Sequence, residues 1–224
     1  MISIDIEMTL ASRSILYGLL QRVFSETPDA ALDELEHSEV TRTAAQVYAD
    51  LATRFDCRGS ECFLIPERPD GFDGDRSPLS LEGEYNRLFV GVGKPAVCTW
   101  ESIYATGNAA LFQANTLTVR QFYERFGLQS RDYPRTADDH VAIELAFMRE
   151  LAIRSIEAHE NSLCQLLHAQ LEFLNAHLGT WVEAFAKQVS DADKTGYYRS
   201  YALMLQAFVN TDKAVLDNLC APSA

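Results

Sequence analysis

The stretch LASRSILYGLLQRVF, residues 10–24, decides the fold class of this chain of 224 residues. Its apolar side chains recur at intervals of three and four residues, at Leu10, Ile15, Leu16, Leu19, Leu20, Val23 and Phe24. This spacing is typical of an α-helix that buries one stripe of its surface. No run of alternating apolar and polar residues elsewhere predicts a convincing strand. We therefore expect an all-α protein.

Similar spacing predicts helices along most of the remaining chain. The expected segments are a short helix with Thr27 as N-cap and Pro28 at its first position, 40–55, 79–89 with Ser80 as N-cap, 105–126, 137–159, 162–177, 181–189 with Thr180 as N-cap, and 192–219. The prediction is a bundle of about nine or ten helices, with a smaller N-terminal part and a larger C-terminal bundle.

Residues 56–79 interrupt the helical spacing. Pro66, Pro69, Gly71 and Gly74 follow one another closely there, among several aspartates, which is typical of a long connection. We expect a single helical domain over residues 1–224 with a flexible loop or hinge at 56–79. A hinge of this kind permits a domain-swapped dimer, so a monomer and a swapped dimer both stay open.

Charge and cysteine content limit the function classes. Nineteen Lys and Arg against thirty-two Asp and Glu give a net charge of −13. Such a surface repels phosphate backbones and anionic lipid heads and suits a cationic partner, so we expect no nucleic acid and no stable membrane insertion. Five cysteines, an odd number, favour a reducing compartment. The first twelve residues carry Asp5 and Glu7 but no Lys or Arg, so a cytoplasmic location is expected.

Patterns for enzymes and metal sites are weak. A di-iron bundle needs two Glu-x-x-His pairs, and the sequence has one, at Glu34 and His37. The segment 91–94 lacks the flanking residues of a phosphate-binding loop. His140 and Glu144 share a helix face and offer one edge of a metal site, which keeps a small metal-dependent enzyme as an alternative. The prediction is a non-enzyme without catalytic residues, metal or cofactor.

Two clusters of polar and aromatic residues remain. In the first, Tyr85, Leu88 and Phe89 share one helix face because they lie three and four positions apart. Gly91 ends that helix and opens a loop. The loop leads to Trp100, Glu101 and Ser102.

The second cluster opens the helix predicted at 137–159. Asp138 or Asp139 is expected to cap its free backbone N–H groups. His140 and Glu144 stack one turn apart on the same helix, followed by Leu145.

Together the clusters resemble the two hallmark motifs of the TorD/DmsD family of redox-enzyme maturation chaperones. The family's first motif is an aromatic-x-x-L-F-x-G-P run, which is matched here by Leu88, Phe89 and Gly91. The segment that ends this motif is matched by Glu101 and Ser102. The chain departs from the motif at Val92 and Gly93, which stand where the family has Pro. Asp139, His140, Glu144 and Leu145 match a D-H-x-x-x-E-L run, and Thr136 and Ala137 replace the acidic residue and Pro before it. Residues 173–181 resemble a third family segment, F-L-x-x-H-L-x-x-W. The resemblance covers essentially the whole chain and implies a TorD-like helical bundle.

Members of this family bind the twin-arginine (Tat) signal peptide of a molybdoenzyme, hold the apoprotein during cofactor insertion and delay its export. The resemblance therefore implies a cytoplasmic chaperone for a molybdopterin oxidoreductase subunit, with the signal peptide and the apo catalytic subunit as partners. An assembly chaperone of the nitrate-reductase type, with a client that is not exported, is the alternative within the family.

Such a peptide needs carboxylates for its guanidinium groups and a trough for the apolar stretch behind them. We expect Asp139, Glu144 and Glu101 to face the arginines, and His140 to orient a carboxylate or accept a proton. The expected trough and its loop comprise Tyr85, Leu88, Phe89, Gly91, Trp100 and Ser102. Asp139→Ala should then weaken peptide binding and change the melting temperature little.

Structural roles for the same residues stay open. Leu88, Phe89 and Leu145 suit a core equally well, and Asp139 suits a helix cap. His140 and Glu144 suit an internal pair. His177 and Trp181 are expected to be packing residues.

Overall fold

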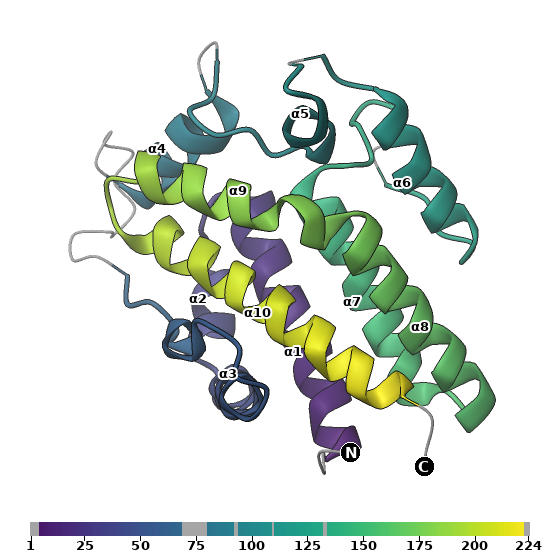
Figure 1. Ribbon diagram of the computed structural model, residues 1–224. Coiled ribbons are helices and arrows are strands. Elements are labelled where there is room, and N and C mark those ends of the chain that lie inside the picture. The colour runs from purple at the N-terminus through teal and green to yellow at the C-terminus, as the bar shows by residue number, and fades with distance from the viewer. Residues whose placement is uncertain (1–4, 69–79, 92–93, 109, 132–133, 222–224) are drawn as a thin grey trace.

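The computed structural model describes residues 5–68, 80–91, 94–108, 110–131 and 134–221, and this part of the chain is helical throughout its regular structure (Figure 1). The α-helices are α1 (Ile6–Ser25), α2 (Ala30–His37), α3 (Glu39–Arg54), α4 (Leu81–Tyr85), α5 (Glu101–Thr106), α6 (Ala114–Glu124), α7 (Val141–Glu157), α8 (Glu160–Ala176), α9 (Leu178–Ala192) and α10 (Tyr197–Cys220). A 3₁₀-helix, η1 (Ser60–Phe63), and a π-helical turn, η2 (Asn86–Val90), complete the set. The predicted all-α bundle is confirmed.

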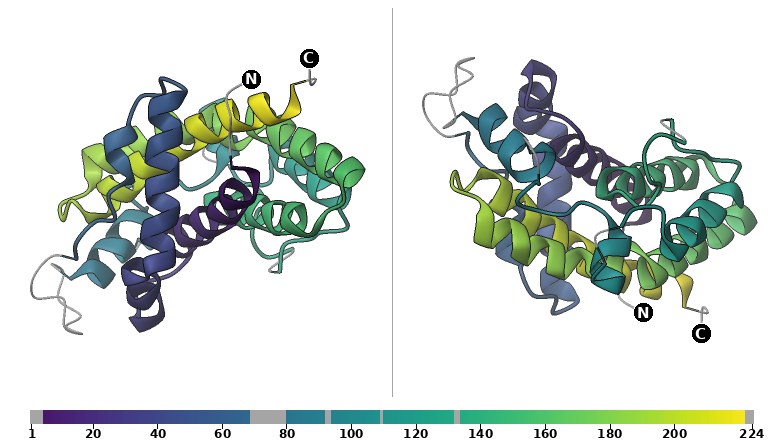
Figure 2. Two further views of the ribbon diagram at one scale, coloured as in Figure 1. Left: turned by 90° about the horizontal axis from the view of Figure 1, so that it is seen from below. Right: turned by 90° about the horizontal axis from the view of Figure 1, so that it is seen from above.

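The bundle is built around α1, which packs along α7 on one side and against α3 on the other. Helices α8, α9 and α10 pack on one another and close the bundle (Figure 1). Seen from below in Figure 2, α3 crosses both α1 and α10. The smaller N-terminal part is thus α2 and α3, while α1 belongs to the larger bundle.

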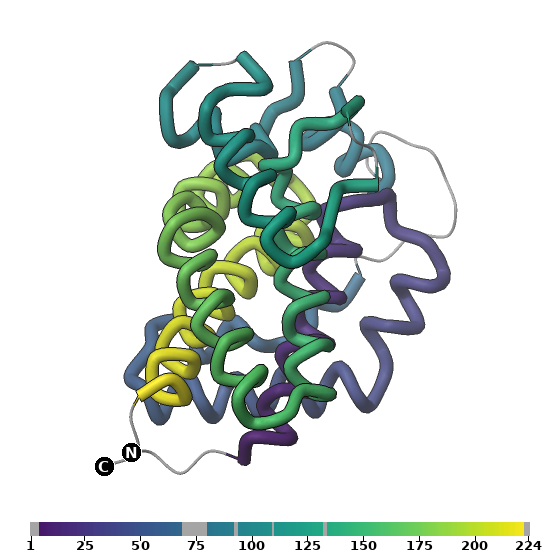
Figure 3. Tube along the Cα trace, turned by 90° about the vertical axis from the view of Figure 1, so that its right-hand side faces the viewer, coloured from purple at the N-terminus to yellow at the C-terminus, as the bar shows by residue number. Residues whose placement is uncertain are grey.

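The segment with α5 and α6 covers one end of the bundle, through contacts between α5 and α9 (Figure 3). The first turn of α1 and the last turn of α10 lie at the other end. None of the helices in the described ranges is long and apolar enough to cross a membrane.

Side-chain caps explain where several helices begin. Ser80 caps α4 as predicted, since its hydroxyl accepts from the Gly83 N–H at 3.0 Å. The cap predicted at Thr27 is wrong, because Asp29 takes this role and accepts from the Leu32 N–H at 2.8 Å. Thr180 is not an N-cap either, because α9 already begins at Leu178.

Several predicted helices differ in extent from those in the structure, and two of the differences follow from glycine conformations. The helix expected over 105–126 is divided into α5 and α6, because Gly107 adopts a left-handed conformation (φ 69°) and ends α5. The last helix begins at Tyr197 and not at Ala192, because Ala192 ends α9 and Gly196 (φ 83°) redirects the chain before α10.

The described part of the predicted loop, residues 56–68, is attached to the bundle. It includes η1, which packs on α3 and α10 and buries Phe63. Arg68 then forms an ion pair with the buried Glu36 of α2, with 2.7 Å between Nε and Oε2. Residues 69–79 lie outside the described residues, so the hinge stays a prediction.

A buried polar cluster joins α1, α3 and α10 inside the core. The Arg13 guanidinium pairs with both carboxylate oxygens of Asp212, at 2.7 and 3.1 Å. The hydroxyls of Tyr17 and Tyr48 donate to the same carboxylate at 2.7 and 2.6 Å. Because Arg13 and Asp212 are fully buried, each depends on the other for its charge compensation.

Candidate functional site

The two clusters predicted to form one site meet in the structure. Trp100 and His140 form an isolated antiparallel bridge, in which the Glu101 N–H donates to the Asp139 carbonyl at 2.9 Å and the Val141 N–H donates to the Thr99 carbonyl at 2.8 Å. The rings of Trp100 and His140 also touch edge to face, with centroids 5.3 Å apart. Backbone pairing therefore fixes the start of α5 against the start of α7.

Asp139 lies underneath this bridge and is fully buried. Its Oδ2 accepts from the Ser102 N–H at 2.9 Å, and its Oδ1 accepts from the Thr116 hydroxyl at 2.8 Å. Both oxygens are thus used to hold α5 and α6, and no face of this carboxylate is open to an arginine from outside. Its predicted contact with a peptide is not available in this conformation.

The cap of α7 is His140, where the sequence predicted Asp138 or Asp139. Its Nδ1 accepts from the Ala142 N–H at 3.2 Å, so the ring is neutral in this role. Burial lowers the pKa of His140 from 6.5 to about 4, although the charge of Asp139 opposes the shift. The side chain thus orients the helix start and stays unprotonated at neutral pH.

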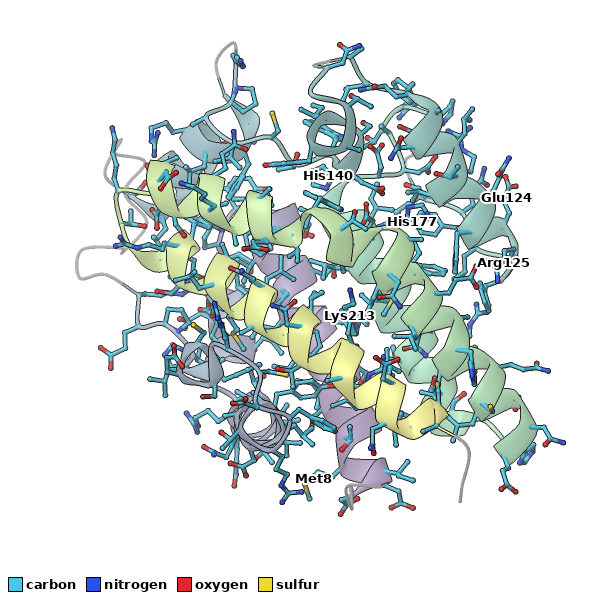
Figure 4. All side chains as sticks on the ribbon, in the orientation of Figure 1. Met8, Glu124, Arg125, His140, His177 and Lys213 are labelled. Carbon is cyan, nitrogen blue, oxygen red and sulfur yellow. The ribbon has the colours of Figure 1, made fainter. Side chains whose placement is uncertain are left out.

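Glu101 and Glu144 form a buried acid pair under the same bridge. Both Glu101 oxygens lie near the His177 Nδ1, at 3.3 and 3.1 Å, and Glu144 Oε2 accepts from the Trp181 indole at 3.3 Å. Burial, and then the charge of Glu101, raises the pKa of Glu144 well above its usual range. Figure 4 shows His177 where α8 meets α9 and His140 beside α5. His177 and Trp181, predicted as packing residues, are buried.

Asp138 extends this acidic cluster toward α6. Its Oδ2 pairs with Arg120 Nε at 2.7 Å, and its carbonyl accepts from the Tyr123 hydroxyl at 3.0 Å. Burial raises the pKa of Tyr123 well above its usual range, and the charges of Glu144, Asp138, Asp139 and Glu101 raise it further. Tyr123 therefore contacts this acidic cluster through the Asp138 carbonyl.

Tyr85, Leu88 and Phe89 belong to the core and not to an open trough. Leu88 is fully buried, and Tyr85 and Phe89 are each 7% exposed. The Phe89 ring packs against Phe24, Phe185 and Tyr198. The core role that stayed open for Leu88 and Phe89 thus describes both residues, which η2 turns inward. Tyr85 at the end of α4 was expected in the trough, and it is buried as well.

Gly91 and Trp100 complete the first cluster. Gly91 has φ 70°, and a side chain there would meet the Pro95 nitrogen at 2.8 Å, so only glycine fits this turn. Trp100 is half-buried and Ser102 fully buried. Val92 and Gly93 lie outside the described residues.

A cavity of about 520 Å³ opens next to the acidic cluster, between α1, α7 and residues 128–131. Its lining includes Tyr123, Leu128, Ile143 and Phe147, with Glu26 and Glu150 among its charged residues. None of the ten predicted site residues lines it, yet Ala142 and Ile143 directly follow the bridge at His140. Sequence reasoning missed this cavity because its walls come from three separate segments without a common motif.

Comparison with known proteins identifies the family. Residues 40–187 match the family model described as nitrate reductase delta subunit. A protein of Vibrio cholerae serotype O1 named Chaperone protein TorD is 30% identical over 148 residues, 66% of this chain and 67% of the relative. The chain belongs to the TorD/DmsD family.

Other relatives of this TorD/DmsD protein extend the match. A Chaperone protein TorD of Photobacterium profundum is 31% identical over 139 residues, 62% of this chain and 64% of the relative. One of Shewanella loihica is 28% identical over 218 residues, 94% of this chain and 95% of the relative. These relatives are named as chaperones and not as enzymes, so the predicted chaperone class and the prediction of a non-enzyme are confirmed.

The geometry gives no support to a metal-dependent enzyme at His140 and Glu144. His140 Nδ1 is engaged with the backbone, and Glu144 Oε2 with Trp181. Among the described residues, one group of potential ligands lies close together, Asp33, Glu36 and His37. The Arg68 guanidinium is already paired with Glu36 and Asp33 there, at 2.7 and 3.2 Å, and its charge disfavours a cation.

Proposed function

We propose that this TorD/DmsD protein is a cytoplasmic chaperone that binds the twin-arginine signal peptide and the apoprotein of a molybdopterin oxidoreductase subunit. It assists cofactor insertion and delays export of the client until the client is folded. Family membership supports the chaperone class, and the features of the site support the cationic, partly apolar ligand.

One observation carries the proposal: a partly apolar cavity lies next to the buried acidic cluster. Leu128, Ile143 and Phe147 offer a surface for the apolar stretch of the peptide. Glu26 and Glu150 place carboxylates at the same opening. Each is paired in the structure, Glu26 with Arg22 at 3.7 Å and Glu150 with Arg154 at 2.8 Å, in partly exposed pairs that a guanidinium of the peptide would have to exchange. Arg131 also lines the cavity, but the net charge of −13 leaves the molecule as a whole attractive to a cationic leader.

The residues predicted from sequence then act behind the contact surface. Asp139 and His140 hold the starts of α5 and α7 together, and this pairing positions Ala142 and Ile143 in the cavity wall. Glu101 and Glu144 add negative charge behind the wall. Tyr85, Leu88 and Phe89 support the site through the core, and Trp100 remains available at the surface beside His140.

The test is titration calorimetry with a synthetic peptide in which two adjacent arginines precede an apolar stretch of Leu and Ala. We expect micromolar binding that weakens at high salt and weakens when both arginines are replaced by glutamine. Ile143→Asp and the double variant Glu26→Gln/Glu150→Gln should each weaken binding about tenfold or more. Glu183→Gln, an exposed position on α9, is the matched control. Equal peptide affinity of all these variants would exclude this cavity as the binding site.

The description of the matching family as nitrate reductase delta subunit favours a second candidate, a chaperone whose client is not exported. The same titration separates the two candidates. A client of this kind has no twin-arginine leader, so the arginine peptide and its glutamine version should then bind equally weakly.

A further inference from the structure

A second cavity, of about 490 Å³, adjoins the proposed peptide site. It lies between α1, α7 and the junction of α2 with α3. Gln21 of α1 lines both cavities. On α7, Glu150 lines the first cavity, and Arg149 and Ile153 line the second. The two cavities thus lie next to each other along the contact between α1 and α7.

The second cavity differs from the first in charge. Among the described residues that line it, two are arginines and none is acidic. Arg22 is already paired, because its Nη2 donates to both carboxylate oxygens of Asp29 at 3.0 and 3.1 Å. Arg149 is exposed and has no hydrogen-bond or ion-pair partner within the part of the chain that the structure describes. Its charge is therefore available to an anionic group.

Gly18 makes room for the side chain of Arg149. It is buried in the interior of α1, where a glycine lowers helix stability relative to alanine. A Cβ atom there would lie 3.0 Å from Arg149 Nε and 3.3 Å from its Cδ. The bare backbone of Gly18 thus allows the Arg149 side chain to lie against α1. A guanidinium group that is held in this way loses little conformational freedom when it binds a ligand.

The remaining walls of the second cavity determine which anion it suits. Ile15, Leu35, Val40 and Ile153 give this cavity apolar surface beside Arg149. A guanidinium group binds a carboxylate through two parallel N–H···O bonds. Its single positive charge balances one carboxylate but only part of the charge of a phosphate monoester. We therefore expect the carboxylate of a Glu or Asp side chain, whose methylene groups contact the apolar walls.

The order of these features along α7 determines where the acidic residue lies in the peptide. Ile143 of the apolar wall comes first, Glu150 follows, and Ile153 of the second cavity comes last. A peptide whose apolar stretch follows its arginine pair therefore extends toward the second cavity with the residues that precede the arginines. Along α1, Glu26 and Gly18 are eight residues apart, which corresponds to about 12 Å. An extended peptide covers this distance with about four residues.

We propose that Arg149 binds an acidic side chain that precedes the arginine pair of the peptide by about four residues. The two cavities then bind opposite charges, which fixes the direction and the register of the peptide. The inference rests on the proposed function and deepens it, because it names a second feature by which the protein selects its client.

The test compares three peptides by titration calorimetry at physiological ionic strength. They share the arginine pair and the apolar stretch and carry Glu, Gln or Lys at the fourth position before the arginines. We expect the Glu peptide to bind about threefold more tightly than the Gln peptide. The net charge of −13 favours Lys at every position, so a preference for Glu over Lys identifies a local positive charge.

Three variants locate this charge. Arg149→Gln should abolish the preference for Glu and leave the affinity of the Gln peptide unchanged. Gly18→Ala should weaken the preference, because the added methyl group displaces the Arg149 side chain. It should not lower Tm, since alanine favours the helix. Arg42→Gln removes an exposed arginine of α3 that lines neither cavity, so this matched control should keep the preference.

The outcomes separate the inference from the proposed function. Affinities that follow peptide charge, with Lys tightest and Glu weakest, overturn the inference and leave the proposed function intact. A preference for Glu that persists in Arg149→Gln, or that is lost equally in Arg42→Gln, also overturns the inference. If no peptide with the arginine pair binds, both are overturned.

Discussion

At the scale of single residues, Asp139 connects three elements with one carboxylate. It accepts from the backbone of α5 and from a hydroxyl of α6, while its own carbonyl accepts from Glu101. All these contacts of Asp139 lie within the protein, so its direct role is to stabilise the fold and not to contact a ligand. We expect Asp139 to affect peptide affinity only indirectly, because it holds α5 and α7 in position.

Asp139→Ala should therefore lower the free energy of unfolding by about 3 kcal/mol, because the Ser102 N–H and the Thr116 hydroxyl lose their buried acceptor. Urea denaturation measures this loss. Asp191→Ala, in an exposed pair with Lys187 on α9, is the control and should cost less than about 1 kcal/mol. An unchanged melting temperature with weaker peptide binding would restore Asp139 as a contact residue.

His140 should make stability depend on pH. Its pKa is about 4 in the folded protein against 6.5 for the ordinary side chain, so between these values the unfolded chain binds a proton that the folded protein does not. Stability should then fall as the pH drops from about 6.5 to about 4, by about 2–3 kcal/mol in total. Thermal unfolding across this range should give a flatter profile for His140→Asn, which keeps a capping side chain. His168→Asn, exposed on α8, should leave the profile unchanged.

The sequence predicted that these residues lie together but not which contacts each one makes. Helical spacing predicted that His140 and Glu144 lie one turn apart, and the family resemblance implied that the start of their helix lies beside Glu101 and Ser102, as it does in the structure. Spacing does not reveal whether a carboxylate faces solvent or another helix. That depends on the bridge between Trp100 and His140, which joins segments far apart in the chain.

At the scale of elements, the turn from α4 through η2 determines where the first cluster points. The π-helical turn ends at Gly91, whose N–H donates to the Asn86 carbonyl. Leu88 is thereby directed into the core, and its carbonyl accepts from the Val97 N–H at 2.9 Å. The conformation of a single glycine thus connects the core to the loop that leads to Trp100.

Gly91→Ala should destabilise the protein by about 2–3 kcal/mol, because the new methyl group meets backbone at 2.8 Å in addition to the unfavourable φ. Gly107→Ala provides a matched control. Its φ is 69°, yet nothing lies within 4 Å of the added carbon, so about 1 kcal/mol is expected. Chemical denaturation measures the free energy of unfolding of the two variants, and the difference between them gives the cost of the steric contact. Equal losses of stability would show that the contact with Pro95 is unimportant.

Elements were predictable where a local signal determines them. Ser80 is followed by a helix that its hydroxyl caps, and the apolar stripe of residues 10–24 is buried in α1 as expected. The break between α5 and α6 was missed because the apolar spacing continues across Gly107. Only the left-handed backbone of that glycine ends the helix, and its identity alone does not fix that conformation.

At the scale of the whole molecule, the Arg13–Asp212 pair joins the beginning of the chain to its end. The pair also recruits Tyr17 and Tyr48, so one carboxylate connects α1, α3 and α10. This cluster was not predicted, because its partners are separated by most of the sequence and each sits within an otherwise apolar stripe.

Asp212→Asn should lower the free energy of unfolding by about 3–5 kcal/mol, because it leaves the buried Arg13 guanidinium without its counter-charge. Glu172→Gln removes the partner of Arg125 in an exposed pair and should cost about 0.5 kcal/mol or less. Guanidinium chloride would screen both pairs, so urea is the suitable denaturant. If both variants lose a similarly small amount of unfolding free energy, the buried Arg13–Asp212 pair contributes little to stability.

The packing of α1 against α7 has a consequence for how the polypeptide is made. Helix α1 is complete at Ser25, whereas α7, which covers much of its apolar stripe, begins only at Val141. While the ribosome is still translating the segment between them, α3 becomes available, but the part of the stripe that α7 covers has no native cover and is open to aggregation or to capture by general chaperones. This chaperone thus itself passes through a long stage of synthesis in which part of its future core is uncovered.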